Sequence, residues 1–361
     1  MTAESDFARK VTAWQRRAGR HDLPWQKVAD PYRVWLSEIM LQQTQVNAVV
    51  PYFDRFLKRF PTLQYLAEAD EDDVLAVWSG LGYYARARNL HRAARQISRI
   101  NQGQFPTRFD DIVALPGVGR STAGAIAVFS FGQRHPILDG NVKRVFARYF
   151  AIEGYPGVQA VANRLWRLAE QLLPERNNVQ AYTQGLMDLG AQVCTRSRPR
   201  CQACPLAQSC AARLQDRIDR LPTPRPKKVR PQRSTVMLVM EYCGRLMMEK
   251  RPASGIWGGL WSFPEIDAAD DARQACRGRF GAEVRTIDQM TTIEHGFTHF
   301  SLTISPLLCE VKERRPQAEM PGRTWVGLDE AMHYPIPVPV RKLVSQLRAR
   351  LGLQASPDQA G

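Results

Sequence analysis

The chain has 361 residues, of which 44% are hydrophobic, and it carries a formal net charge of +15. This length favours two domains, and the hydrophobic content excludes a disordered chain. No apolar run approaches the ~20 residues that cross a bilayer, and the start lacks the apolar segment of a signal peptide. We therefore expect a cytoplasmic protein without membrane association, whose positive field favours a phosphate backbone as partner.

The first part of the chain, to about residue 215, has helical patterns. Asp30-Pro31 predicts an N-cap followed by proline at the first helical position, and apolar residues from Tyr32 to Met40 recur at helical spacing. Further helices are expected over about 46–59, 71–79, 85–101, 109–115, 120–130, 141–150, 158–173 and 179–190. The pattern predicts an all-α domain over residues 1–218.

Residues 219–233 contain four prolines and six basic residues, which predicts an extended linker. Short strand patterns follow, with a turn at Cys243-Gly244, and indicate an α+β domain over residues 234–352. The last residues, 353–361, are polar and are predicted to be a disordered tail.

Four cysteines lie close together in the sequence at Cys194, Cys201, Cys204 and Cys210, spaced C-x6-C-x2-C-x5-C. In a reducing compartment thiols stay available to metals, and four thiolates suit a cubane iron–sulfur cluster or a tetrahedral zinc ion. Several arginines lie between them, at 196, 198 and 200. A metal-organised loop that presents arginines again favours a polyanionic partner.

Residues 112–129 predict two short helices joined by the turn Pro116-Gly117-Val118-Gly119. Glycines let a backbone approach a ligand closely, and free N–H groups at the start of the second helix suit a phosphate. The alternative is a plain helical hairpin with a glycine turn. The string LPGVGRSTA together with the net charge favours a DNA-binding helix–hairpin–helix.

Two carboxylates are candidates for acid–base chemistry. Glu38 lies among mostly apolar neighbours, where partial burial would raise its pKa; periodicity alone equally permits a solvated side chain. Asp139 precedes a helix, where it can serve as an N-cap, and a cap holds a carboxylate in a fixed direction.

At this point the chain resembles a known family. SEIMLQQTQV, GLGYYARARNL, LPGVGRSTAGAI, LDGNVKRV and the four-cysteine spacing, in this order, are similar to the adenine DNA glycosylase (MutY) family of the endonuclease III superfamily. The resemblance implies a six-helix barrel module, a module holding a [4Fe–4S] cluster through the four cysteines, and a Nudix-like C-terminal domain. It also implies a nucleoid-associated monomer that removes adenine opposite 8-oxo-guanine or guanine in double-stranded DNA.

The resemblance also implies roles for individual residues. Glu38 matches the acid that protonates the departing adenine, Asp139 the carboxylate that stabilises the oxocarbenium-like sugar, and Asn141 a polar neighbour that orders the site. Ser121 occupies a DNA-facing position where bifunctional relatives carry a lysine nucleophile, and a hydroxyl cannot form a Schiff base. This match favours a monofunctional hydrolase.

A base stacked in a duplex must be flipped out before it can react. Gln26 and Gln43 match positions that line the pocket for the flipped adenine, and Tyr83 matches a residue that wedges into the stack. Core packing is the alternative for Tyr83 and its neighbour Tyr84, and we expect one of the two to follow it. Arg86 and Arg88 are expected to contact phosphates, with a solvated helix face as the alternative.

In the second domain, Phe297-Thr298-His299 resembles a loop that senses 8-oxo-guanine, with threonine in place of the usual serine. The sequence lacks the acidic box of Nudix hydrolases, so we interpret this domain as a recognition module. Two other functions stay open: a bifunctional glycosylase/lyase, opposed by Ser121 and by the long C-terminal extension, and a non-catalytic DNA-binding protein with a zinc site.

Overall fold

The computed structural model describes residues 3–26, 29–226, 229–297, 299–315 and 320–350; the predicted tail lies outside these ranges. The chain divides into two compact units, residues 1–68 with 89–227 and residues 69–88 with 228–361. Each unit has a buried hydrophobic core of its own. None of the described helices is both long and apolar enough to span a membrane.

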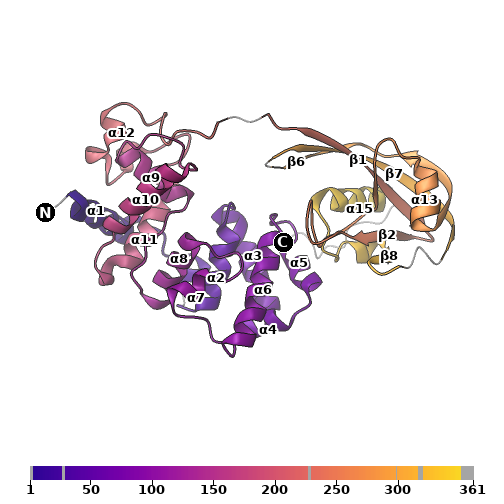
Figure 1. Cartoon of the computed structure of the whole chain (residues 1–361), viewed down its shortest axis with the longest axis horizontal. Helices are drawn as coiled ribbons and strands as arrows, with labels where there is room; N and C mark the ends of the chain where they lie inside the picture. Colours follow the sequence, from indigo (N-terminus) through magenta and orange to yellow (C-terminus); the bar gives the residue numbers. More distant parts are fainter. Residues whose placement is uncertain (1–2, 27–28, 227–228, 298, 316–319, 351–361) are drawn as a thin grey trace. The chain divides into compact units, whose positions relative to one another are not determined.

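The first unit is helical, as predicted (Figure 1). Asp30 caps α2 by accepting a hydrogen bond from the Tyr32 backbone N–H, with Pro31 in the first turn. Gly132 ends α8 with a φ of 60°. The helices are α1 (Ala3–Ala18), α2 (Pro31–Leu41), α3 (Val46–Arg59), α4 (Leu63–Glu68), α6 (Ala85–Ile100, whose first turn belongs to the other unit), α7 (Phe109–Val113), α8 (Arg120–Phe131), α9 (Gly140–Tyr149), α10 (Gln159–Gln171), α11 (Val179–Asp188) and α12 (Ala211–Leu214).

Short helical turns complete this unit. They lie at Pro24–Gln26, Arg176–Asn178, Leu189–Val193, Cys201–Ala203 and Ala207–Ser209. Helices α1, α4 and α12 fall in the region expected to be helical, although none of them was among the separate patterns identified from the sequence.

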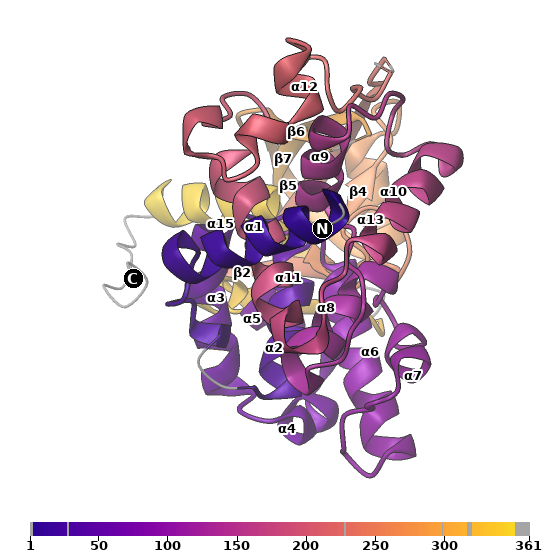
Figure 2. The same cartoon turned by 90° about the vertical axis from the view of Figure 1, so that its left-hand side faces the viewer.

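Phe7 of α1 organises the part of the core that supports the site. Its ring is fully buried and packs edge-on against Phe146 and Tyr149 of α9 and Tyr182 of α11. Helix α1 therefore packs along α11, as Figure 2 shows. Burying one phenylalanine contributes about 2–3 kcal/mol, so this contact holds α9 and α11 firmly against each other.

The second unit contains α5 (Glu71–Trp78) and a mixed sheet, which confirms the predicted α+β domain. The sheet order is β3-β2-β1-β7-β5, with β1 parallel to β7 and antiparallel pairs elsewhere. The elements are β1 (Gln232–Tyr242), β2 (Arg245–Lys250), β3 (Trp261–Ser262), β4 (Glu265–Ile266), α13 (Ala272–Phe280), β5 (Ala282–Gln289), β6 (Ile293–Gly296), β7 (Ser301–Arg314), β8 (Arg323–Gly327), α14 (Leu328–Ala331) and α15 (Val338–Arg350).

The central strand of this sheet is covered on both faces. Met237, Leu238, Val239 and Met240 are four successive buried residues of β1, as expected for a parallel strand inside a layered fold. The predicted turn at Cys243-Gly244 joins β1 to β2 with both residues at positive φ. Strand β1 begins at Gln232, two residues inside the segment predicted as linker, because Gln232 pairs with Ser301 of β7.

Candidate active site

The first unit contains a cavity of about 1530 Å³. Its walls include the loop before α2, α2 itself, the start of α8, the start of α9, α11 and residues 190–196. Glu38, Asp139 and Ser121 all line it, together with Gln26 and Gln43. With Asn141, which also lines it, the structure brings six of the residues singled out from the sequence to one cavity, although they are spread over more than a hundred positions.

Glu38 lies on α2, and its side chain is partly buried at the cavity wall. Burial raises the pKa of this carboxyl to about 8, with a further contribution from the negative charge of Asp139. Of the two sequence-based interpretations, the semi-buried acid is therefore confirmed. A carboxylic acid with this pKa still holds its proton at neutral pH and can donate it.

Asp139 is the N-cap of α9, as predicted. Its Oδ1 accepts a hydrogen bond from the Val142 backbone N–H at 2.7 Å, and its Oδ2 accepts from Asn141 Nδ2 at 3.1 Å. Burial raises the pKa of Asp139, whereas these hydrogen bonds and the positive charge of Arg144 act in the opposite direction. The cap fixes the direction of a carboxylate that is already inside the cavity.

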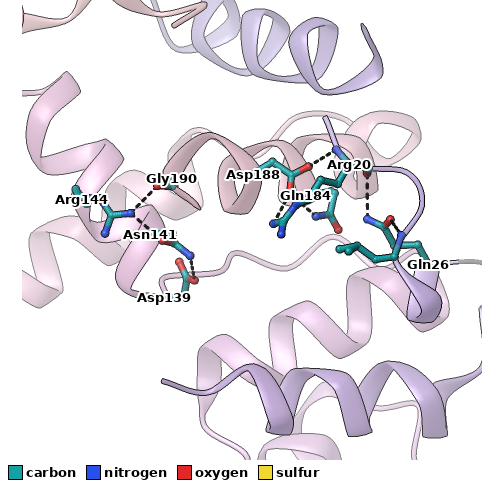
Figure 3. A network of polar contacts seen from close by, with 9 residues as sticks. Arg20, Gln26, Asp139, Asn141, Arg144, Gln184, Asp188 and Gly190 are labelled. Carbon is teal, nitrogen blue, oxygen red and sulfur yellow. Dashed lines mark hydrogen bonds and ion pairs between the residues drawn. The ribbon is translucent and has the colours of Figure 1, made fainter. Parts of the chain in front are cut away.

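Asn141 connects the Asp139 carboxylate to residues 194–210, here called the cysteine segment. The connection runs through Arg144, which the sequence analysis did not single out. Figure 3 shows Arg144 between Asn141 and the chain near Gly190. Its guanidinium donates to Asn141 Oδ1 at 2.8 Å, to the Gly190 carbonyl at 2.6 Å and to the Cys194 carbonyl at 2.7 Å. Asp139, Asn141, Arg144 and the first cysteine thus form one continuous hydrogen-bonded chain.

Gly190 is necessary for this contact. A Cβ atom at this position would lie 2.5 Å from Asn141 Cβ, closer than real side chains approach. The absence of a side chain lets the π-helical turn Leu189–Val193 pass directly over the start of α9. The same turn is followed directly by Cys194, so the cysteine segment begins next to the start of α9.

A second polar network, separate from the first in Figure 3, lies around Asp188 at the end of α11. This carboxylate is fully buried and pairs with Arg20 at 2.6 Å and with the amide nitrogen of Gln184 at 2.9 Å. The sequence analysis missed these three residues. Only the apolar environment of Asp188 in GLMDLGA could have pointed to a buried charge.

Gln26 lines the cavity, but its amide is engaged with its own loop. Its Oε1 accepts from the Leu23 backbone N–H at 3.1 Å, and its Nε2 donates to the Arg20 carbonyl at 3.2 Å. Gln26 thus lines the cavity as expected, and each end of its amide also holds the loop in shape; its contact with a base edge stays a prediction.

Gln43 lines the cavity as expected, from a position just beyond α2, which ends at Leu41. It has a φ of 58°, an uncommon conformation for a residue with a side chain, and its side chain is exposed at the cavity. Gln42 lies beside it within 3.4 Å of the Gly117 carbonyl and of Thr122 Oγ1.

The helix–hairpin–helix has the predicted geometry. Its turn lies between α7 and α8, with Gly117 at a φ of 79° and Gly119 as the N-cap of α8. A Cβ on Gly117 would lie 2.8 Å from the Asn89 side chain, so this position requires glycine for space as well as for conformation. Ser121, two residues later, accepts a hydrogen bond from the Leu138 backbone N–H at 2.9 Å and so steadies the approach to Asp139.

Tyr83 and Tyr84 divide as expected. Tyr84 is 9% exposed and belongs to the core, whereas Tyr83 is 48% exposed with a φ of 48°. An exposed aromatic ring on a strained backbone is typical of a functional position.

Arg86 does not contact solvent as a phosphate-binding side chain would. It is 8% exposed, donates to the Leu81 and Gly82 carbonyls at 3.2 Å, and lies over the rings of Trp78 and Tyr83. Burial lowers its pKa to about 10. The expected phosphate contact is therefore wrong for this residue, which instead supports the loop that presents Tyr83.

Arg88, the second predicted phosphate contact, donates to the carbonyl of Gly258 within the second unit. In the same unit, Phe297 stacks on Phe300 with ring centroids 4.5 Å apart and packs edge-on against His295. His299 is exposed, and Thr298 lies outside the described residues. The aromatic cluster is completed by Trp257, 5.5 Å from Phe297.

The four cysteines are free thiols that influence one another's charge. Burial, with smaller contributions from Cys194, Cys210 and Cys201, raises the pKa of Cys204 to about 12. Arg148 donates a hydrogen bond to Cys194 Sγ at 3.4 Å. Within the described ranges, no three histidine, cysteine or acidic side chains are close enough to hold a single metal ion.

Comparisons with known proteins agree with both units. Residues 36–171 match the family model described as HhH-GPD superfamily base excision DNA repair protein, and residues 235–346 match the NUDIX domain. A protein of Buchnera aphidicola (strain APS) named adenine DNA glycosylase is 36% identical over 350 residues, which cover 96% of this chain and 98% of that protein. The human protein of the same name is 32% identical over 90% of this chain and 70% of its own length.

Solved structures resemble the helical unit. A thermostable thymine-DNA glycosylase superposes with a TM-score of 0.54 and 27% identity, covering 59% of this chain and 97% of that one. Endonuclease III in a non-covalent DNA complex superposes with a TM-score of 0.51 over 60% of this chain and 99% of its own. At 19% identity the latter likeness concerns the fold alone.

Proposed function

This chain belongs to the adenine DNA glycosylase family and hydrolyses the N-glycosyl bond of adenine in DNA; we propose that the adenine it removes lies opposite 8-oxo-guanine or guanine. The proposed mechanism rests on one observation. Glu38, with a pKa of about 8, and the capped carboxylate of Asp139 line the same cavity. One group supplies a proton, and the other supplies a negative charge.

In the proposed mechanism, Glu38 transfers its proton to N7 of the flipped adenine. The electrons of the C1′–N9 bond leave with the protonated base, so that neutral adenine departs and positive charge develops on the sugar. Asp139 stabilises this charge, and its cap and its hydrogen bond from Asn141 hold it in place. Water then adds to C1′ and returns a proton to Glu38.

Ser121 supports the hydrolytic, monofunctional reaction. Its hydroxyl accepts a backbone hydrogen bond and offers no amine for a Schiff base with the sugar. A bifunctional enzyme would cut the DNA strand without further treatment. We therefore expect intact strands after incubation, with breaks appearing only after heat or alkali.

We propose that the four cysteines hold a [4Fe–4S] cluster. Their mutual charge effects and the hydrogen bond from Arg148 suit thiolates gathered around a positively charged group. The cluster would stabilise the loop and its arginines. If the cluster is present, purified protein should be brown and contain about four iron atoms per chain. A colourless protein with one zinc ion would contradict the proposed cluster.

The exposed Tyr83, the helix–hairpin–helix turn and the two residues Phe297 and His299 support duplex DNA as the substrate. We propose that the protein acts on it as a monomer in the cytoplasm, next to the nucleoid. The decisive experiment incubates the full chain with duplexes that carry adenine opposite 8-oxo-guanine, guanine, cytosine or thymine. Adenine should be released fastest from the first two. Equal release from all four would refute the proposed substrate while leaving the reaction itself intact.

A further inference from the structure

Tyr83, the exposed ring that we expect to enter the DNA stack, lies in the second unit, on the segment of residues 69–88. This segment comprises α5, the loop that carries Tyr83 and the first turn of α6. The loop is tied internally, because Trp78 Nε1 donates to the Gly82 carbonyl at 3.2 Å and the Arg86 guanidinium lies 5.4 Å from the centre of the Tyr83 ring. The position of the ring therefore depends on what holds the two ends of the segment.

The start of α5 is attached to the sheet of the same unit through Asp72. Its Oδ1 accepts from Lys250 Nζ at 2.7 Å, and its Oδ2 accepts from Trp261 Nε1 at 3.0 Å. Lys250 is the last residue of β2, and Trp261 is the first residue of β3. The side chains of the ion pair are 35% and 36% exposed, so this contact contributes little to global stability and can be changed without threatening the fold.

The end of α5 is attached to the last helix of the unit through Ser79. Its Oγ donates to the Ile336 carbonyl at 3.3 Å and accepts from Arg341 Nη2 of α15 at 3.1 Å. Both ends of α5 are thus held by the unit that contains Phe297.

Arg88 connects the far side of the Tyr83 loop to a turn that also reaches the aromatic cluster. Its guanidinium donates to the Gly258 carbonyl. The preceding residue, Trp257, has a φ of 52° and its ring lies 5.5 Å from that of Phe297. A side chain at Gly258 would collide with the Ala253 carbonyl oxygen, so the turn is closely packed. A single peptide unit therefore connects the contact to Phe297 with the contact to Arg88.

We propose that Asp72 and Arg88 are positioning residues that hold Tyr83 in a fixed place relative to Phe297, and that this arrangement sets the preference for 8-oxo-guanine over guanine opposite adenine. Two groups that must meet one base at the same time bind it better when they are already in place, because less freedom is lost on binding. The two bases differ only at C8 and N7, so loosely held groups separate them poorly. This inference rests on the function proposed above.

Asp72 distinguishes positioning from simple phosphate binding, which Arg88 alone does not. A carboxylate repels phosphate, so Asp72→Ala should leave the affinity for duplex DNA unchanged or raise it, while the preference for 8-oxo-guanine falls. Asp70→Ala is the matched control, because it removes the same charge from an exposed side chain at the start of the same helix.

The test measures single-turnover adenine release by the full chain from duplexes with adenine opposite 8-oxo-guanine or guanine. In Asp72→Ala and in Arg88→Met, the ratio of the first rate to the second should fall by about three- to tenfold, as expected when one hydrogen-bonded anchor is lost. Asp70→Ala should keep the wild-type ratio. Both rates come from one preparation, so the fraction of folded enzyme cancels in the ratio.

The Tyr83→Ala background shows whether the anchors act through this ring. With no ring to place, Asp72→Ala and Arg88→Met should cause no further change in the ratio. A fall of the same size in that background would overturn the inference, and so would an unchanged ratio in Asp72→Ala. Failure of the wild type to release adenine opposite either base would instead count against the proposed function, so the two failures are distinguishable.

Discussion

At the residue scale, the chemistry depends on how the surroundings of a single glutamate change its acidity. Glu38 occupies a helix whose other side chains are largely buried, and Asp139 adds a negative charge nearby. Both effects favour the protonated form. The pKa of about 8 lies above the ordinary value of 4.5, so the carboxyl of Glu38 keeps its proton across the neutral range.

This acidity predicts a pH dependence for adenine release. If the protonated carboxyl of Glu38 is the active form, the single-turnover rate should be constant near pH 7 and fall about tenfold per pH unit above about 8. The measurement is a rate profile from pH 6 to 10 at saturating enzyme. A rate that rises through this range would mean that the required form of Glu38 is the carboxylate.

The Glu38→Gln variant should release no measurable adenine and still bind the mismatched duplex, because the amide keeps the shape without a transferable proton. Exposed Glu175→Gln provides the matched control and should retain wild-type rates. Wild-type turnover by Glu38→Gln would remove this residue from the mechanism.

The same substitution should also affect stability, with a defined sign. The folded state holds the Glu38 proton up to about pH 8 and the unfolded chain releases it near 4.5, so wild-type stability falls between these values as pH rises. Glu38→Gln removes this loss. Allowing for partial solvent exposure, we expect the variant to gain on the order of 1–3 kcal/mol relative to wild type above pH 8, measured by denaturant unfolding. An equal difference at pH 5 would contradict the linkage.

At the scale of secondary-structure elements, helix α9 and the cysteine segment act as one assembly. Arg144 joins them by donating to Asn141 and to the carbonyls of Gly190 and Cys194. Charge-assisted hydrogen bonds of this kind contribute about 1.5–3 kcal/mol each when their partners are buried. The position of the Asp139 carboxylate therefore depends on a loop that lies far away in the sequence.

The Arg144→Met variant tests this dependence. It should slow adenine release by about tenfold or more, since Asn141 loses the partner that orients it toward Asp139. Arg213→Met is a suitable control, because Arg213 donates to a single carbonyl within the cysteine segment. Equal effects of the two substitutions would show that general weakening of the loop, and not the connection to Asn141, determines the rate.

The cysteine segment itself should matter for folding and DNA affinity more than for the chemical step. Cys201→Ser is expected to lower the unfolding temperature or the affinity for duplex DNA, because a lost ligand releases the arginine-bearing loop. Cys243→Ser, at an exposed turn of the second unit, is the control and should be neutral. A stable Cys201→Ser protein with normal DNA affinity would argue against a structural cluster.

At the scale of the whole molecule, we propose that the two units divide the task of recognition. The helical unit holds the cavity, and the second unit presents an aromatic cluster around Phe297 with His299 exposed beside it. The sequence lacks the acidic box of Nudix hydrolases, and on that ground we interpret this unit as a recognition module. Recognition of the base opposite adenine is the function that suits it.

His299→Ala should therefore reduce the preference for 8-oxo-guanine over guanine opposite adenine, while adenine opposite guanine is still released. The preference is measured as the ratio of the two rates at subsaturating enzyme, and we expect it to fall several-fold. His333→Ala, a histidine elsewhere in the same unit whose ring contacts a backbone carbonyl, serves as control. A parallel loss on both substrates would place His299 in general DNA binding.

The sequence alone determined those features that depend on local patterns. Helix boundaries followed from caps such as Asp30 and Asp139, the hairpin from Gly117 and Gly119, and the change of fold class from strand patterns after residue 234. Through the family resemblance, motifs in a fixed order also predicted Glu38 and Asp139 as the reacting pair. Each of these signals is contained within a few neighbouring residues, so no knowledge of the packing was required.

Only the tertiary structure decided which side chains share a surface. It placed Arg144 between Asn141 and the cysteine segment, buried Arg86 under Tyr83, ended α2 before Gln43, and paired Asp188 with Arg20 across 168 positions. The burial that raises the pKa of Glu38 is likewise a property of packed neighbours. These outcomes escape sequence patterns because charge, desolvation and amide orientation depend on distances between segments, which are set only when the chain has folded.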